Sequence, residues 1–428
     1  MIATALVTLL ALMALAIPVA AAMGVLGLVL GQMFAMLPVS RVAGEIAWTA
    51  SNEFLLVALP LFILLGELLL RSGLAERMYE ALARWLSWLP GGLMHSNIAA
   101  CAMFAATSGS SVATAATVGT VALPQARRFG YNERLFLGSL AAGGTLGILI
   151  PPSINMIVYA VLTNTSVPKL YLAGIVPGLV LSLGFMAVIA LACLWRPAWG
   201  GQRITSSLRA ALAGLVYLGP PLGVFLVVVG SIYAGLATPT EAASLGVMAG
   251  LALAAWNRTL NWPMLRECLL GTMRSTGMIM LIIVAAYFLN FVMSAIGLTT
   301  RITDTVQTLG LSKWEMLFAV VVFYVILGCF METLSMMITT IPIIAPVMQA
   351  LGFDMVWFGI VVIVLVETAL ITPPVGLNLF VVHNLRKSGS MNDVIIGALP
   401  FVAAMFLLLL LLALFPGLAL WLPSVVSQ

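Results

Sequence analysis

Two polar interruptions of otherwise apolar sequence repeat at one fixed spacing, and their residue types suit the binding of ions. The first comprises the polar stretch 108–114, then Pro124 and the pair Pro151-Pro152. The second comprises the polar stretch 328–335, then Pro346 and the pair Pro373-Pro374. Pro124 and Pro346 are 222 positions apart, and so are Pro151 and Pro373, which indicates two repeats. Such residues are tolerated at membrane depth where they line a cavity, and a matching pair is typical of a transporter site.

Each Pro-Pro pair suits a particular ion chemistry. Adjacent prolines lack two N–H donors and crowd the preceding turn, so the helix must open there. The freed carbonyls suit a monovalent cation such as Na⁺, and the N-terminus of the next half-helix suits an anionic substrate group. The polar tips and the residues beyond the breaks supply the candidate substrate-binding residues, which are Ser108, Ser110, Ser111, Asn155, Glu332 and Asn378. The alternative is a pair of proline kinks whose small residues serve helix packing.

Composition decides the class of protein. Hydrophobic residues make up 63% of the 428 residues and charged residues only 7%, whereas a soluble domain carries about 25% charged residues. Apolar runs such as 401–422 are long enough to cross a lipid bilayer as helices. The sequence therefore predicts an all-α polytopic membrane protein. Nucleic acid is excluded as a partner, because no soluble basic face exists, and the sequence has no HExxH or paired-Asp motif of an intramembrane enzyme.

The elements that must position these residues are predicted from apolar length. The predicted spans cover about 2–17, 19–36, 52–70, 134–163, 170–195, 207–235, 240–256, 270–296, 355–385 and 393–422. Segments 74–89 and, more weakly, 298–312 are amphipathic, as interfacial helices are. The stretches 92–127 and 313–350 each have a polar tip between apolar limbs that are marginal for a full crossing, so we interpret them as re-entrant hairpins. Two ordinary spans joined by a short loop are the alternative.

The number of crossings predicts the orientation of the halves. Each half contains five, so the second half enters the membrane inverted relative to the first. Fourteen basic residues then face one side, and only Arg41, Lys169, Arg301 and Lys313 face the other. Positive residues favour the cytoplasm, which places both termini outside. The predicted division is 1–91 (scaffold and amphipathic arm), 92–163 (first hairpin and broken helix), 164–313 (scaffold and second arm), 314–386 (second hairpin and broken helix) and 387–428 (C-terminal helix).

The acidic residues near apolar segments fall into two groups. Glu241 has the spacing of a helix capping box, and Glu67 lies four residues before Arg71, which is a favourable helical pair. These structural roles explain the presence of both residues without a role in transport. Glu332 and Glu367 fall at a polar tip and just before a break, where an ionisable group is a candidate for a functional role.

Several phrases, in order along the chain, resemble the large membrane subunit of tripartite ATP-independent periplasmic (TRAP) transporters. They are SGSSVATAATVG, GGTLGILIPPS, SVPKLYLAGIVPG, TPTEAASLGV and ITPPVGLNLFV, and the match covers nearly the whole chain. The resemblance implies an elevator-type secondary transporter of inverted-repeat design, with Na⁺ as the coupling ion and no organic cofactor. It also implies a small four-helix membrane subunit and a periplasmic binding protein as partners, and a bacterial or archaeal inner membrane as the location.

The resemblance further implies the ligands of Na⁺, mostly backbone oxygens. Carried over motif by motif, they fall on Ser108, Gly109, Ser110, Gly144, Pro151, Ser153, Gly328, Glu332, Thr333, Thr372, Pro373 and Gly376. The family commonly has Asp where Glu332 stands, so the second ion site is expected to differ in detail. Some members fuse the small subunit ahead of the large one, whereas this sequence starts with the large subunit and implies a separate small partner.

The predicted function is Na⁺-coupled import of small organic anions, such as C4-dicarboxylates or sugar acids, with no enzymatic activity. The alternative is a stand-alone Na⁺- or H⁺-coupled dicarboxylate or citrate transporter of the same inverted-repeat design. A channel is a third candidate, and saturable, stoichiometric Na⁺-dependent uptake would exclude it.

Overall fold

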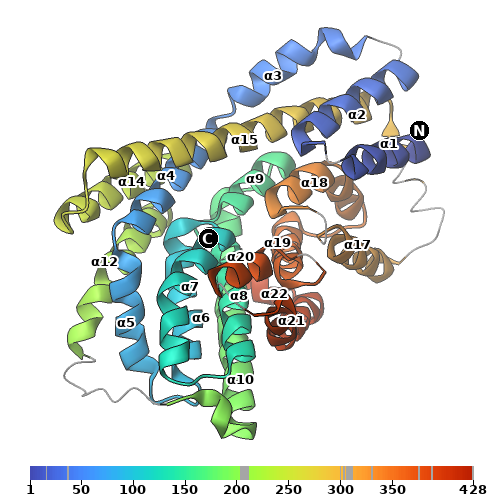
Figure 1. The fold of residues 1–428 in the computed structure, drawn as a ribbon. Coiled ribbons are helices and arrows are strands. Elements are labelled where there is room, and N and C mark those ends of the chain that lie inside the picture. The colour runs from blue at the N-terminus through green and yellow to red at the C-terminus, as the bar shows by residue number, and fades with distance from the viewer. Residues whose placement is uncertain are drawn as a thin grey trace.

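The protein is helical, as a computed structural model shows (Figure 1). The structure describes residues 1–428 except 16, 36–37, 203–211, 299, 302–303, 305–311, 329–330, 375, 387–388 and 427–428. Within this described part no strand occurs, which confirms the predicted all-α class. Six of the described helices are long and apolar enough to cross a membrane, and a bent pair makes a seventh.

The first half of the chain contains a helical hairpin and a broken helix. Its helices are α1 (Ile2–Ala14), α2 (Val19–Phe34), α3 (Ala43–Ser51), α4 (Ala58–Arg71), α5 (Leu74–Leu86), α6 (Gly92–Ser108), α7 (Ser111–Arg128), α8 (Glu133–Leu149), α9 (Ile154–Thr163) and α10 (Val167–Trp195). Helices α6 and α7 form the predicted first hairpin. Helices α8 and α9 are bent by 43° at the Pro151-Pro152 break.

The second half repeats this order. Its helices are α12 (Gly219–Phe225), α13 (Ser231–Tyr233), α14 (Pro239–Trp256), α15 (Trp262–Ala295), α17 (Lys313–Leu327), α18 (Thr333–Ala350), α19 (Met355–Ile371), α20 (Leu377–Arg386), α21 (Met391–Leu414) and α22 (Gly417–Val426). Helices α7 and α18 each have 18 residues, and α8 and α19 each have 17. Both pairs begin at the offset of 222 found in the sequence, which confirms the two repeats with two hairpins and two broken helices.

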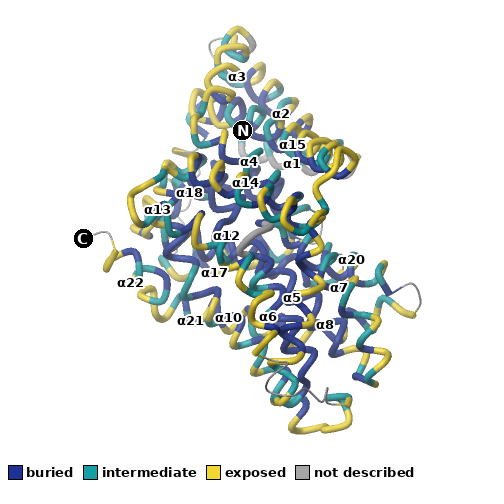
Figure 2. Tube along the Cα trace, turned by 90° about the vertical axis from the view of Figure 1, so that its left-hand side faces the viewer, coloured by how far each residue is buried: buried dark blue, intermediate teal, exposed yellow. Residues whose placement is uncertain are grey.

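Helix α8 is at the centre of the molecule. It packs against α6, α7, α10, α19 and α21, and every residue from Leu135 to Leu149 is buried. Glycines permit its closest contact, since a Cβ added to Gly138 would lie 1.9 Å from the Gly397 carbonyl oxygen of α21. Figure 2 shows buried residues in this interior and exposed residues along α3. The dense packing of α8 fixes the position of the break that follows it.

Helices α4 and α15 form a second layer, which faces the hairpins. Helix α15 has 34 residues and packs against α2, α3 and α4 (Figure 1). A short α4–α15 ion-pair network joins the two: Arg71 Nε lies 3.3 Å from Glu67 Oε2, and Arg71 also pairs with Glu267. The predicted Glu67–Arg71 pair is therefore confirmed, and so is the capping box of Thr238 and Glu241.

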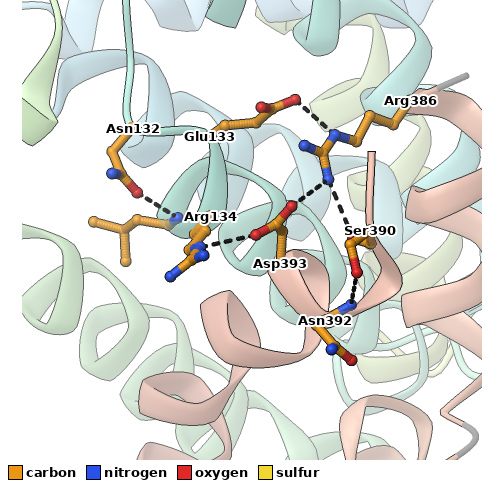
Figure 3. A network of polar contacts seen from close by, with 8 residues as sticks. Asn132, Glu133, Arg134, Arg386, Ser390, Asn392 and Asp393 are labelled. Atoms are coloured by element: carbon orange, nitrogen blue, oxygen red, sulfur yellow. Dashed lines mark hydrogen bonds and ion pairs between the residues drawn. The ribbon is translucent and has the colours of Figure 1, made fainter. Parts of the chain in front are cut away.

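Charged residues join the two broken helices at the end where α8 begins (Figure 3). Arg386, the last residue of α20, lies 2.7 Å from Glu133 of α8 and 3.1 Å from Asp393 of α21. Asp393 also lies 2.9 Å from Arg134. Only 8% of the Arg386 side chain is exposed. This network ties the start of one broken helix to the end of the other.

Three predicted boundaries differ from the structure. The C-terminal span 393–422 is two helices, because Phe415 leaves the helical conformation before Pro416 (φ −128°, ψ 75°), as residues preceding proline tend to do. The span predicted over 270–296 begins at Trp262. The amphipathic segment 74–89 is a helix that ends at Leu86, whereas most of 298–312 lies outside the described residues. The division into scaffold and hairpin domains stays a prediction.

Candidate functional site

A cavity of about 370 Å³ brings both hairpin tips together with the α4–α15 layer. The first tip supplies residues 109–113, and the second supplies Glu332, Thr333 and Leu334. Ile154, Asn155 and Leu377 come from the half-helices that follow the two breaks. The opposite wall is Ile63, Gly66, Glu67 and Leu70 of α4 with Ser275, Met278 and Ile279 of α15. Two segments that are 222 residues apart in sequence therefore open into one space.

The first hairpin tip presents several oxygen atoms. Gly109 ends α6 in the left-handed conformation, with φ of 61°. Ser110 caps α7, its hydroxyl accepting from Ala113 N at 3.4 Å. The Ser111 hydroxyl donates to the Thr145 carbonyl of α8 at 3.3 Å, which ties the tip to the broken helix. The side chain of Ser108 lies outside the described residues.

Two glycines of α8 let the tip approach the break. A Cβ added to Gly147 would lie 2.9 Å from the Ser110 carbonyl oxygen and 3.0 Å from Ser111 N. One added to Gly144 would lie 2.6 Å from Ala115 Cβ. Side chains at either position would push the tip away, so the sequence Gly-Gly-Thr-Leu-Gly before the prolines serves this close contact.

Asn378 supplies a further oxygen at the same place. Its Nδ2 donates to the Ala141 carbonyl at 3.2 Å, while its Oδ1 is buried and has no hydrogen-bond partner among the described residues. The assignment of amide oxygen and nitrogen follows this hydrogen-bond network. The Asn378 amide lies beside Gly144, where its Nδ2 would be 3.1 Å from an added Cβ. Its orphaned oxygen, together with carbonyls that the prolines free, fits a monovalent cation with oxygen ligands. Ser153, the predicted ligand after the break, caps α9 and accepts from Met156 N at 3.4 Å.

The second hairpin tip has a carboxylate where the first has a hydroxyl. Glu332 caps α18, accepting from Ser335 N at 3.1 Å and from the Thr333 hydroxyl at 3.0 Å. Gly328 lets α17 approach α19, since a Cβ there would lie 2.0 Å from Ala369 Cβ. A cavity of about 270 Å³ separates this tip from the second break. It is lined by Gly328, Met331, Glu332, Thr333, Val366, Ala369, Leu370 and Leu377.

The second break has a simpler set of polar contacts. The Thr372 hydroxyl donates to the Thr368 carbonyl at 2.6 Å, so it completes its own helix end. Gly376 is left-handed, with φ of 59°, and a Cβ there would lie 3.0 Å from the Leu370 carbonyl oxygen. Pro373 belongs to this break and lines neither cavity.

The structure brings together four of the six predicted substrate-binding residues, and two predicted ion ligands, Gly109 and Thr333, line the same cavity. Ser110, Ser111, Asn155 and Glu332 line the larger cavity, while Asn378 lies behind it against α8. Asn155 also contacts the second repeat, its Nδ2 lying 3.5 Å from Met337 Sδ.

The wall formed by α4 and α15 is not among the elements predicted to carry the site. Glu67 forms the expected ion pair, and it also lines the cavity. The absence of a side chain at Gly271 makes room for it, since a Cβ there would lie 2.9 Å from the Glu67 carboxyl carbon. The charged residues among those lining the 370 Å³ cavity are both acidic, Glu67 and Glu332. Helix N-termini are the groups at this cavity that would favour an anion.

Comparison with known proteins identifies the family. The family described as "Tripartite ATP-independent periplasmic transporter, DctM component" matches residues 6–418. The chain belongs to this family. It is 36% identical over 380 residues to the C4-dicarboxylate TRAP transporter large permease protein DctM of Pseudomonas aeruginosa, covering 87% of each chain. It is also 30% identical over 380 residues to the sialic acid TRAP transporter large permease protein SiaM of Vibrio cholerae, again covering 87% of each.

A solved structure supports the fold. The YdaH transporter of Alcanivorax borkumensis has a TM-score of 0.55 and 16% identity, covering 88% of this chain and 90% of that one. At this identity the likeness concerns the fold alone. The family match confirms the predicted resemblance, and the chain is a TRAP large permease, a multi-pass membrane protein and not an enzyme.

Proposed function

We propose that this TRAP large permease imports small organic anions together with Na⁺. One observation carries the proposal. In each repeat a polar hairpin tip lies next to a Pro-Pro break, and both of these pairs contribute residues to one cavity of about 370 Å³. The first pair combines the Ser110 and Ser111 tip with freed carbonyls and the orphaned Asn378 Oδ1. The second combines the Glu332 cap with a neighbouring cavity. Oxygen ligands suit a hard cation, and carbonyls of unwound helices coordinate Na⁺ in transporters of inverted-repeat design.

The cargo class is argued from charge and from relatives. The N-termini of α7, α9 and α18 lie at or beside the cavity, and helix N-termini favour anionic groups. The named relatives transport C4-dicarboxylates and sialic acid, both of which carry carboxylates. A Na⁺ ion at each tip would offset the carboxylates of Glu67 and Glu332, so cargo and ion would bind interdependently.

The mechanism we propose is movement of the hairpins past the α4–α15 layer. The cavity wall consists of these two parts, and the orientation predicted from the basic residues opens one hairpin to each side of the membrane. A small membrane subunit and a periplasmic binding protein, which TRAP permeases generally need, would complete the system.

The test is uptake into liposomes that contain the permease and its small membrane subunit, with the binding protein added outside. We expect accumulation of a radiolabelled C4-dicarboxylate or sialic acid only with an inward Na⁺ gradient, and none when choline replaces Na⁺. Uptake that persists without Na⁺ would refute the coupling. Uptake that persists without the binding protein would favour the stand-alone dicarboxylate transporter instead.

A further inference from the structure

Glu67 places a carboxylate in the wall of the cavity that is proposed to hold an anion. It lies on α4, in the wall opposite the two hairpin tips, and 23% of its side chain is exposed. A negative charge there repels anionic cargo, and the repulsion is stronger in a partly enclosed cavity than in bulk water. A purely structural ion pair does not explain why this charge lies in the cavity wall.

Two helices hold the Glu67 carboxylate in place. On α15, a Cβ added to Gly271 would lie 2.9 Å from the Glu67 carboxyl carbon and 2.9 Å from its Oε1, so only glycine leaves room for the group. On α4 itself, Arg71 Nε lies 3.3 Å from Glu67 Oε2. Arg71 also pairs with Glu267 of α15. The charge of Glu67 is thus offset by a cation one helical turn away.

The stability of the fold does not account for this pair. The Arg71 and Glu67 side chains are 34% and 23% exposed, and ion pairs that solvent reaches contribute little to stability. The equivalent residues of the second repeat, 222 positions later, are Leu289 and Met293 of α15, which are 3% and 2% exposed. The second repeat therefore forms the corresponding helical turn without charges, and the pair is a feature of the cavity wall in the first repeat alone.

We propose that Glu67 and Arg71 are specificity-determining residues that set how many negative charges the cargo carries. Glu67 disfavours each additional carboxylate on the cargo, and Arg71 offsets this repulsion from the same helix. Neutralising either residue changes the charge of the wall by one unit, and the two changes have opposite signs. The inference rests on the proposed function, because it requires anionic cargo in this cavity.

The test compares two ligands that differ by one charge. For the purified full chain in lipid nanodiscs with NaCl, we measure the concentrations of succinate and succinamate that give half-maximal thermal stabilisation. Succinamate has an amide in place of one carboxylate. We expect Glu67→Gln to raise the preference for succinate about three- to tenfold and Arg71→Gln to lower it by a similar factor. Sialic acid and its methyl ester form a second such pair, for use if succinate does not stabilise the wild type.

A double variant and a matched pair control for structural effects. Glu67→Gln with Arg71→Gln restores the net charge of the wall, so its preference should return to within about twofold of the wild type. It also decides the contribution of Arg71 if Arg71→Gln alone does not fold. Glu80 and Arg84 of α5 have the same helical spacing at 3.8 Å, but they are not among the residues that line the cavity. Glu80→Gln and Arg84→Gln should keep the wild-type preference within about twofold, since solvent and salt screen these exposed charges.

The outcomes separate this inference from the proposed function. Because each preference compares two ligands on one variant, a general loss of stability does not imitate the expected shifts. Shifts of the same sign in Glu67→Gln and Arg71→Gln, or no shift in either, would overturn the proposed specificity while the cargo class stands. A wild type that neither succinate nor sialic acid stabilises would refute the cargo class, and this inference with it.

Discussion

Helices α7 and α8 of the first repeat have the same lengths as α18 and α19 of the second, but their caps differ in charge. Ser110 caps α7 and Asn132 caps α8, whereas Glu332 caps α18 and Asp354 caps α19. Each pair is separated by the repeat offset of 222. At these two helices the first repeat thus has neutral caps and the second has acidic ones. Because a carboxylate accepts stronger hydrogen bonds and attracts cations, the two tips are expected to bind ions unequally.

The close contact between hairpin and broken helix is also made differently in the two repeats. In the second, Gly328 of the hairpin meets Ala369 of the broken helix. The equivalent sequence positions in the first are Ala106 and Gly147, so the glycine has changed sides. Each repeat retains one glycine and one alanine in the pair. From this exchange in sequence we expect the total space provided by the pair to matter more than which helix provides it.

The largest expected effect comes from filling this space. In Gly328→Ala the new Cβ would lie 2.0 Å from Ala369 Cβ, so α17 and α19 must separate and the second tip must shift. We expect uptake to fall by roughly tenfold or more, as overpacking costs about 1–3 kcal/mol. The double variant Gly328→Ala with Ala369→Gly copies the pair of the first repeat and should restore most of the uptake. If the double variant is as impaired as the single one, the idea of an exchanged pair is wrong.

A smaller effect should separate the two caps. Glu332→Ala removes a carboxylate that accepts from a backbone N–H at 3.1 Å, whereas Ser110→Ala removes a hydroxyl whose bond is 3.4 Å long. We expect the Na⁺ concentration for half-maximal uptake to rise roughly tenfold in Glu332→Ala and about two- to threefold in Ser110→Ala.

Glu332→Ser serves as the control for this comparison, because it gives the second tip the cap of the first. It should fall between the two alanine variants. Equal Na⁺ dependence in Glu332→Ala and Ser110→Ala would show that the charge of the cap does not determine how strongly each tip binds Na⁺.

Much of the fold and of the site follows from local chemistry in the sequence. The hairpins and breaks could be predicted, because their signals are local. Prolines without N–H groups, glycines that allow close contact and small polar tips each change the backbone at their own position. Pro416 carries the same local signal, but it falls within a long apolar run that favours one continuous helix. The role of Glu67 could not be predicted, because its place in the cavity wall depends on α15, about two hundred residues later in the chain.

The smallest effects should come from the two ends at which the broken helices meet. At one end Arg386 joins α20 to α8 and α21 through ion pairs of 2.7 and 3.1 Å. At the other, the Tyr159 hydroxyl of α9 donates to the Met355 carbonyl of α19 at 2.8 Å. Arg386→Met leaves two carboxylates without their shared cation, so we expect a Tm about 4–8 °C lower.

Tyr159→Phe keeps the ring, which packs against Gly359, and removes only a neutral hydrogen bond. Its Tm should fall by about 1–3 °C. Both variants should keep the wild-type Na⁺ dependence of uptake within about twofold, because neither residue lines the cavities at the tips. Arg386→Lys is the control, since it retains the charge but loses the forked geometry that serves Glu133 and Asp393 together. A larger loss of stability in Tyr159→Phe than in Arg386→Met would mean that the neutral end, and not the charged one, holds the two repeats together.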